Sequence, residues 1–197
     1  MGLFTLIIVV AGGYLLGSIP FGLLLTQWAG MGDIRDIGSH SIGATNVLRT
    51  GNKKIAIATL LLDMAKGALA VLIFGFLFAS PYAPVLAGVA AFIGHCFPVW
   101  LDFKGGKGVA TYFGITFAFS PAAGLLAAVI WLTTAVISRY SSLSGLITVS
   151  LMPIAFLVFG MPIHFFAMAL IGVLVFWRHK ENIERLRTGT EPKIGNK

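Results

Sequence analysis

The sequence predicts an all-helical integral membrane protein with seven spans, and three observations support this fold class. Hydrophobic residues make up 57% of the 197 residues and charged residues only 11%, whereas soluble domains carry about 25% charged residues. Four long runs contain no Asp, Glu, Lys or Arg: residues 1–32, 67–101, 108–138 and 140–177. Each run exceeds the roughly 20 apolar residues that cross a bilayer as a helix. The 24 glycines suit closely packed membrane helices, and we expect a single domain.

The boundaries of the spans follow from Pro, Gly and Ser clusters between the apolar runs. They predict spans at about 3–28, 55–79, 84–101, 108–119, 121–138, 142–160 and 162–178. The first run lacks a basic n-region and is too long for a signal peptide, so we interpret it as a retained span. The segment 108–119 makes only about 18 Å of helix, against a hydrocarbon core of about 30 Å. It is expected to be a short or broken span, or part of a kinked helix with 121–138.

The basic residues predict the orientation of these spans. With the N-terminus outside and the C-terminus inside, the inner face holds residues 29–54, 102–107, 139–141 and the tail from 178. Every Lys and Arg except Lys66 then lies inside, as the positive-inside rule requires. Counting 108–138 as one crossing would move Arg139 to the other face. The net charge of +7 is therefore attributed to topology, and we expect no nucleic-acid partner.

One inner loop has the composition of an anion-binding site. The stretch FKGGKGVAT, residues 103–111, places Lys104 and Lys107 around two glycines, just before a predicted helix. Glycines let backbone N–H groups turn toward one anion, and a helix N-terminus adds positive potential. It is not a Walker A loop, because Leu101 and Gly108 occupy positions that need Gly and Ser or Thr. We expect phosphate binding; a tight turn whose lysines serve only topology is the alternative.

Two further inner segments carry polar side chains suited to phosphate. In GSHSIGATNVLR (38–49), Ser39, Asn46 and Arg49 can hydrogen-bond phosphate, and Arg49 can do so bidentately. A structured loop leading into the next span is the alternative. In WRHKENIERL (177–186), a continuing helix would place Arg178, Asn182 and Arg185 on one face. A basic helix touching anionic lipid headgroups is the alternative there.

We single out four polar or reactive residues within the predicted spans. His95 suits general-base chemistry near neutral pH, or else it is a hydrogen-bonded packing residue. Asp63 and Lys66 lie one helical turn apart and are interpreted as an ion pair that neutralises itself. Cys96, the single cysteine, is interpreted as a small packing residue. No cluster of His, Cys, Asp or Glu has metal-ligand spacing.

The polar segments occur in a characteristic order: GSHSIGATNVLR, then GHCFPVWLDFKGGKGVAT, then RHKENIERLRTGTE. Together with LGSIPFG (16–22) and LLDMAKG (61–67), they closely resemble the acyl-phosphate-dependent glycerol-3-phosphate acyltransferases of bacteria, the PlsY family. The resemblance extends from about residue 14 to 191. Ser41 stands where the first motif of that family usually has Asn, which puts a side-chain amide role at this position in doubt.

The resemblance implies a monomeric enzyme of the bacterial inner membrane whose motifs face the cytoplasm. It would transfer a fatty acyl group from acyl phosphate to the 1-hydroxyl of sn-glycerol 3-phosphate, giving lysophosphatidic acid and phosphate. Membrane lipid surrounds the enzyme, and no cofactor or metal is expected. A small-anion transporter is the alternative, because transporters also direct helix N-termini at anions.

The resemblance also implies roles for individual residues. The residues expected to act in catalysis are His95, Lys104, Lys107, Arg49, His179 and Asn182. Those expected to bind substrate are Ser39, Asn46, Gly105, Gly106, Gly108 and Ser142. Glu191 is expected to be structural.

Overall fold

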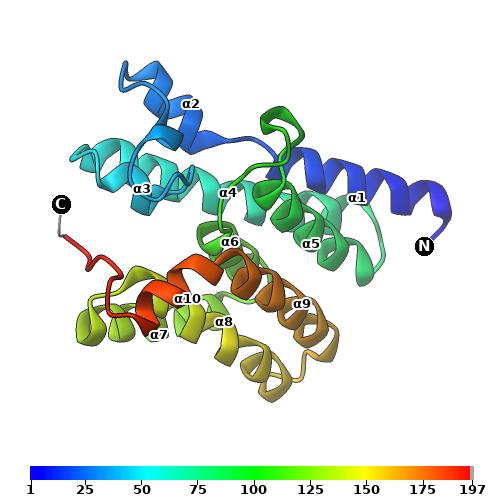
Figure 1. Ribbon diagram of the computed structural model, residues 1–197. Helices are drawn as coiled ribbons and strands as arrows, with labels where there is room; N and C mark the ends of the chain where they lie inside the picture. Colours follow the sequence, from blue (N-terminus) through cyan, green and yellow to red (C-terminus); the bar gives the residue numbers. More distant parts are fainter. Residues whose placement is uncertain (196–197) are drawn as a thin grey trace. The chain divides into compact units, whose positions relative to one another are not determined.

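The structure is a computed structural model that describes residues 1–195, and these residues form helices joined by loops (Figure 1). Two compact units are distinguished, Met1–Ala118 and the part of the chain that begins at Phe119. The first unit holds α1 (Leu3–Gly17), α2 (Phe21–Trp28), α3 (Ala44–Leu48), α4 (Lys53–Leu77), α5 (Tyr82–Cys96) and, except for its last residue, α6 (Val109–Phe119). Short 3-10 turns lie at Ile34–Asp36 and Val99–Leu101. The second unit holds α7 (Pro121–Ser138), α8 (Ser141–Val158), α9 (Pro162–Arg178) and α10 (Lys180–Arg187). The predicted all-α class is confirmed, and the single domain stays a prediction.

Several predicted helix starts and ends agree with the structure, but α5 ends at Cys96 and not at residue 101, and two predicted helices are broken. Helices α7 and α9 begin at the prolines that the sequence marked as starts. The first predicted span is broken between α1 and α2, because Pro20 has no backbone N–H and disfavours helical geometry at Ile19. The helix expected to continue past residue 178 also breaks, at His179, and α10 leaves α9 at an angle of 62°.

Length and hydropathy identify five helical segments of residues 1–195 that can cross a membrane: Leu3–Trp28, Lys53–Leu77, Tyr82–Leu101, Pro121–Ser138 and Ser141–Val158. The bent pair α9 and α10 adds a sixth if it counts as one span, and α6 is a shorter apolar helix. Large apolar side chains such as Phe76 (91% exposed) and Val158 (78% exposed) cover outward faces, as lipid contact requires. The count of seven spans and their orientation stay predictions.

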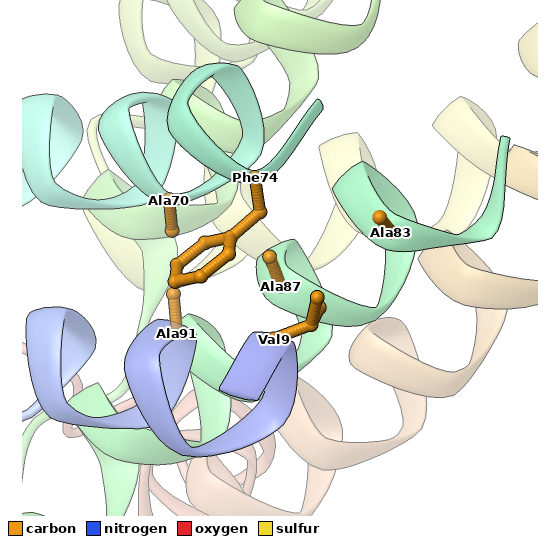
Figure 2. Close-up of a cluster of buried hydrophobic side chains, with 6 residues drawn as sticks. All are labelled: Val9, Ala70, Phe74, Ala83, Ala87 and Ala91. Carbon is orange, nitrogen blue, oxygen red and sulfur yellow. The ribbon is translucent and has the colours of Figure 1, made fainter. Parts of the chain in front are cut away.

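Small residues allow the helices of the first unit to pack closely. Helices α1, α4 and α5 lie side by side, and the ring of Phe74 extends from α4 toward Val9, Ala87 and Ala91 (Figures 1 and 2). A side chain at Gly17 in α1 would overlap the backbone carbonyl of Ala91 in α5. This is the small-residue packing that brings membrane helices together.

Replacing Gly17 with Ala tests this packing. The added methyl group would push α1 and α5 apart, and we expect the free energy of unfolding to fall by about 2 kcal/mol. Thermal unfolding in detergent would measure the change. Gly2→Ala is the matched control, since a methyl group there meets nothing within 4 Å. Equal unfolding temperatures for the two variants would contradict the close approach.

Candidate active site

Asn46 shapes the loop that precedes α4. Its amide nitrogen donates to three backbone carbonyls: Ile34 (3.0 Å), Ile37 (2.9 Å) and Ser41 (2.9 Å). Its amide oxygen accepts from the N–H of Ser39 at 2.9 Å, and the residue is 1% exposed. A side chain so fully bonded to the backbone serves as a scaffold. Its predicted role in substrate binding stays a prediction.

Arg49 ends α3 and extends across the scaffold that Asn46 builds. Its Nη1 lies 3.1 Å from the position a Cβ would take at Gly38, where φ is +60°. Within residues 1–195 the half-buried guanidinium has no ion pair or hydrogen bond. Arg35, in the same loop, differs because its Nη2 lies 2.6 Å from Asp33 Oδ2. That side-chain hydrogen bond holds the pKa of Asp33 below its ordinary value.

The consecutive glycines of the KGGKG loop (104–108) serve close packing. The Gly105 N–H donates to the carbonyl of Cys96 and the Gly106 N–H to that of His95, both at 3.1 Å. These two N–H groups therefore do not form the anion nest expected from the sequence. A side chain at Gly105 would overlap the His95 carbonyl, and one at Gly106 would overlap the His95 imidazole. Gly108 has φ +84°, a conformation that favours glycine.

The positive charge expected beside these glycines is present. Lys104 is exposed and Lys107 is half-buried. Helix α6 begins at Val109, directly after the loop, and the Gly108 carbonyl accepts from the N–H of Tyr112 at 2.8 Å. The positive end of the α6 dipole thus lies next to Lys107. Anion attraction in this loop depends on two ammonium groups and a helix N-terminus.

A charged cluster is buried where α4 meets α5. Lys66 Nζ lies 2.8 Å from Asp63 Oδ1, which confirms the predicted ion pair. Lys66 also donates to the carbonyl of Ile19 at 2.7 Å, at the break between α1 and α2. His95 Nδ1 lies 3.7 Å from the same Asp63 oxygen. The contact with Ile19 was not detectable from the sequence, because it joins residues that are far apart in the chain.

In the second unit, Glu191 accepts hydrogen bonds from three side chains. Its Oε1 accepts from Ser142 Oγ at 2.6 Å and from Asn182 Nδ2 at 2.7 Å, and its Oε2 accepts from Arg185 Nε at 2.7 Å. Burial alone would raise the pKa of Glu191, but the bonds from Ser142, Asn182 and Arg185 outweigh it and hold the pKa below its ordinary value. Glu191 thereby ties the tail to α8 and α10, which suits a structural role.

His179 lies at the bend between α9 and α10 and is 3% exposed. Its Nδ1 is 2.8 Å from the carbonyl oxygen of Val175. Because a carbonyl only accepts, this contact requires the proton on Nδ1. In the neutral ring, Nε2 then carries the lone pair, as a proton acceptor must.

The second unit also has an apolar groove along α8 that includes residues of α9 and α10. Its lining consists of Leu143, Leu146, Ile147, Ser150, Phe176, Ile183, Leu186 and Arg187. Arg187 is the only charged side chain of this lining. The groove therefore combines an apolar surface with one cation.

The predicted site residues are distributed over both units. The first unit contains Ser39, Asn46, Arg49, His95, Lys104, Gly105, Gly106, Lys107 and Gly108, and the second contains Ser142, His179, Asn182 and Glu191. In the first unit, the structure brings His95 against Gly106. In the second, it brings Ser142 and Asn182 to Glu191. The bond from Arg185 to Glu191 was missed, because Glu191 lies beyond the end of α10 and outside helical spacing.

Replacing Glu191 with Gln tests the bonds that hold the tail. In the variant, the NH2 group of Gln would face the Nε–H of Arg185, so two donors would meet where a hydrogen bond now lies. We therefore expect the unfolding free energy to fall by about 2 kcal/mol at neutral pH. The pKa of Glu191 in the folded protein lies below its ordinary value of 4.5. The extra unfolding free energy of the wild type is therefore complete above pH 4.5 and is lost as the pH falls through the folded-state pKa. Thermal unfolding in detergent from about pH 8 to about pH 3 would measure it.

The control is Glu184→Gln, which removes the same charge from an exposed position of α10. It is expected to change the unfolding temperature little at any pH. Equal behaviour of the two variants would show that Glu191 does not anchor the tail.

Comparisons with known proteins identify the family of this chain. Residues 7–189 match the family model described as glycerol-3-phosphate acyltransferase. A glycerol-3-phosphate acyltransferase of Agrobacterium fabrum is 56% identical to this chain, and the match covers 94% of this chain and 90% of the relative. A glycerol-3-phosphate acyltransferase of Allorhizobium ampelinum is also 56% identical, and the match covers 98% of this chain and 94% of the relative. The crystal structure of PlsY, an integral membrane glycerol 3-phosphate acyltransferase, in its glycerol 3-phosphate form has a TM-score of 0.91 and 38% identity, covering 96% of both chains. The lysophosphatidic acid form of that protein has a TM-score of 0.89. This chain therefore belongs to the glycerol-3-phosphate acyltransferase family, as its motifs predicted.

Proposed function

We propose that this protein transfers a fatty acyl group to glycerol 3-phosphate at a bacterial cell membrane. The observation that carries the proposal is the likeness over 96% of the chain to a solved acyltransferase in its glycerol 3-phosphate form. The cationic groups of the first unit support it: Arg49 has no acidic partner within residues 1–195, and Lys104 is exposed. Such groups suit phosphate ligands.

The proposed acyl donor is acyl phosphate, a reactive mixed anhydride. The 1-hydroxyl oxygen of glycerol 3-phosphate attacks the carbonyl carbon, the bond from that carbon to the phosphate oxygen breaks, and phosphate departs. Lysophosphatidic acid is the other product. Because the donor is already activated, no covalent acyl-enzyme is needed. Catalysis then depends on positioning both reactants and on stabilising charge at the carbonyl oxygen and the leaving phosphate.

Two groups of side chains have proposed roles in the reaction itself. Arg49, Lys104 and Lys107 hold the phosphate groups. His95, His179 or a phosphate oxygen of the substrate accepts the hydroxyl proton. His179 suits that role because its Nδ1 bonds the Val175 carbonyl, which leaves the lone pair of the neutral ring on Nε2.

Further residues support the substrates rather than take the proton. Ser39 and Ser142 supply hydroxyl groups to the substrates, and Asn182 assists from α10. The glycines of the KGGKG loop contribute by close packing, as their contacts with α5 indicate. We place the site at the cytoplasmic face of the inner membrane, where phosphorylated metabolites are available, in a monomer that needs no cofactor.

The groove of the second unit is the proposed site of the acyl chain. Its lining is almost wholly apolar, which suits a hydrocarbon chain, and Arg187 suits the phosphate at the end of that chain. A chain bound there would enter sideways from the bilayer.

Replacing Ile147 with Trp tests the groove. The indole would fill part of it, so we expect KM for palmitoyl phosphate to rise about tenfold, equal to about 1.4 kcal/mol of lost binding. The KM for acetyl phosphate, which has no chain to place, should stay unchanged. Ile137→Trp on the exposed face of α7 (79% exposed) is the control. An equal effect on both donors would contradict a chain site in the groove.

The reaction is tested with purified protein, palmitoyl phosphate and glycerol 3-phosphate, with lysophosphatidic acid as the measured product. In this assay, Arg49→Ala is expected to lower kcat/KM about 100-fold, because it removes hydrogen bonds between a charged donor and a phosphate. The control Arg35→Ala changes an arginine of the same loop that is already paired with Asp33. It should stay within about twofold of the wild type.

Two results would oppose this proposal. Full activity of Arg49→Ala would remove the guanidinium from the phosphate site. Absence of lysophosphatidic acid, together with counterflow of labelled phosphate across vesicles, would favour the transporter alternative.

A further inference from the structure

Asp63 and Lys66, which lie outside the three motif segments, form a buried charged cluster with His95 of the second segment. The three residues are 1%, 2% and 3% exposed, and all belong to the first unit. Two come from α4 and one from the last turn of α5. Charges buried this deeply in an apolar bundle are costly, and they commonly have a function.

The ion pair with Lys66 does not use the whole carboxylate of Asp63. Lys66 Nζ is bonded to the carbonyl of Ile19 at 2.7 Å and lies 2.8 Å from Asp63 Oδ1. Asp63 Oδ2 is buried and has no hydrogen-bond partner within residues 1–195. A buried acceptor in this state favours the approach of another donor.

His95 lies beside this carboxylate, on its Oδ1 side. Its Nδ1 lies 3.7 Å from Asp63 Oδ1, beyond hydrogen-bond length, so a movement of about 0.5–1 Å would complete the bond. The opposite edge of the ring faces the KGGKG loop, because Nε2 is the atom closest to a side chain built at Gly106. Asp63 and Lys66 of α4 form the charged cluster with this ring, the Cys96 thiol of α5 acts on Lys66, and the KGGKG loop that the ring faces carries Lys104 and Lys107.

We propose that Asp63 is a positioning residue that accepts the Nδ1–H of His95 and so keeps the lone pair of the imidazole on Nε2, toward the KGGKG loop. Lys66 neutralises the carboxylate, so that this buried acceptor adds no net charge to the bundle. A carboxylate behind a histidine fixes its tautomer and orientation and stabilises the imidazolium formed when Nε2 takes a proton. An effect of Asp63 on the reaction rate rests on the proposed function, whereas the tautomer of His95 does not depend on it.

The tautomer is measured directly by NMR of protein labelled with nitrogen-15 histidine. The chain has four histidines, and His95→Asn would assign the signal of His95. We expect a neutral ring protonated on Nδ1. His179 serves as an internal reference, because its Nδ1 bonds the Val175 carbonyl. A His95 ring protonated on Nε2 would overturn the proposal, whatever the activity.

The kinetic arm uses Asp63→Leu combined with Lys66→Met. Removing both charges leaves no unpaired buried ion, and replacing such pairs with apolar residues commonly preserves folding. We expect kcat to fall about 30-fold, KM for glycerol 3-phosphate to stay within about threefold, and the Nδ1–H population of His95 to decrease.

The outcomes separate this proposal from the proposed function. A folded double variant with wild-type kcat would overturn the positioning role. A wild-type protein that makes no lysophosphatidic acid but has His95 protonated on Nδ1 would oppose the proposed function alone. If the double variant does not fold, the wild-type tautomer decides.

Discussion

The structure depends on one constraint: polar groups inside an apolar helical bundle must find their partners within the protein, since lipid offers none. Pro20 breaks the first apolar run, and the carbonyl of Ile19 just before it accepts from the N–H of Phe21 at 3.1 Å. Lys66 adds a second donor to this carbonyl at 2.7 Å, and Asp63 neutralises the charge that Lys66 brings. A kink in one helix is thus stabilised by an ion pair from another. The same pair places a carboxylate near His95, so an element of fold stability also reaches the proposed site.

The glycines illustrate how one composition can have two physical meanings. Consecutive glycines between lysines indicated converging N–H groups, yet Gly105 and Gly106 donate to the carbonyls at the end of α5. Their lack of side chains lets the loop lie against the His95 carbonyl and imidazole. The positive potential expected there therefore comes from Lys104, Lys107 and the start of α6. A substitution at either glycine would displace the loop and with it both lysines.

Local signals predicted the parts of the fold that depend on neighbouring residues. Prolines at the starts of α7 and α9 fixed those boundaries, and the i,i+3 spacing of Asp63 and Lys66 was sufficient to predict their ion pair. Contacts between distant segments were not predictable. The break at Pro20 was missed because hydropathy is continuous across it. The motif residues were located by resemblance to a family, since their spacing alone left a structured loop as an equal alternative.

The contrast between paired and unpaired charges separates structural residues from those available to a ligand. Asp33 pairs with Arg35, Asp63 with Lys66, and Glu191 with Arg185. Arg49 has no such partner within residues 1–195, although its guanidinium lies over a loop that Asn46 holds rigidly. A half-buried cation on a rigid support loses little conformational entropy when it binds an anion, and the guanidinium can form strong bidentate hydrogen bonds with that anion. This is why we propose Arg49 as the guanidinium that binds a phosphate group of the substrates.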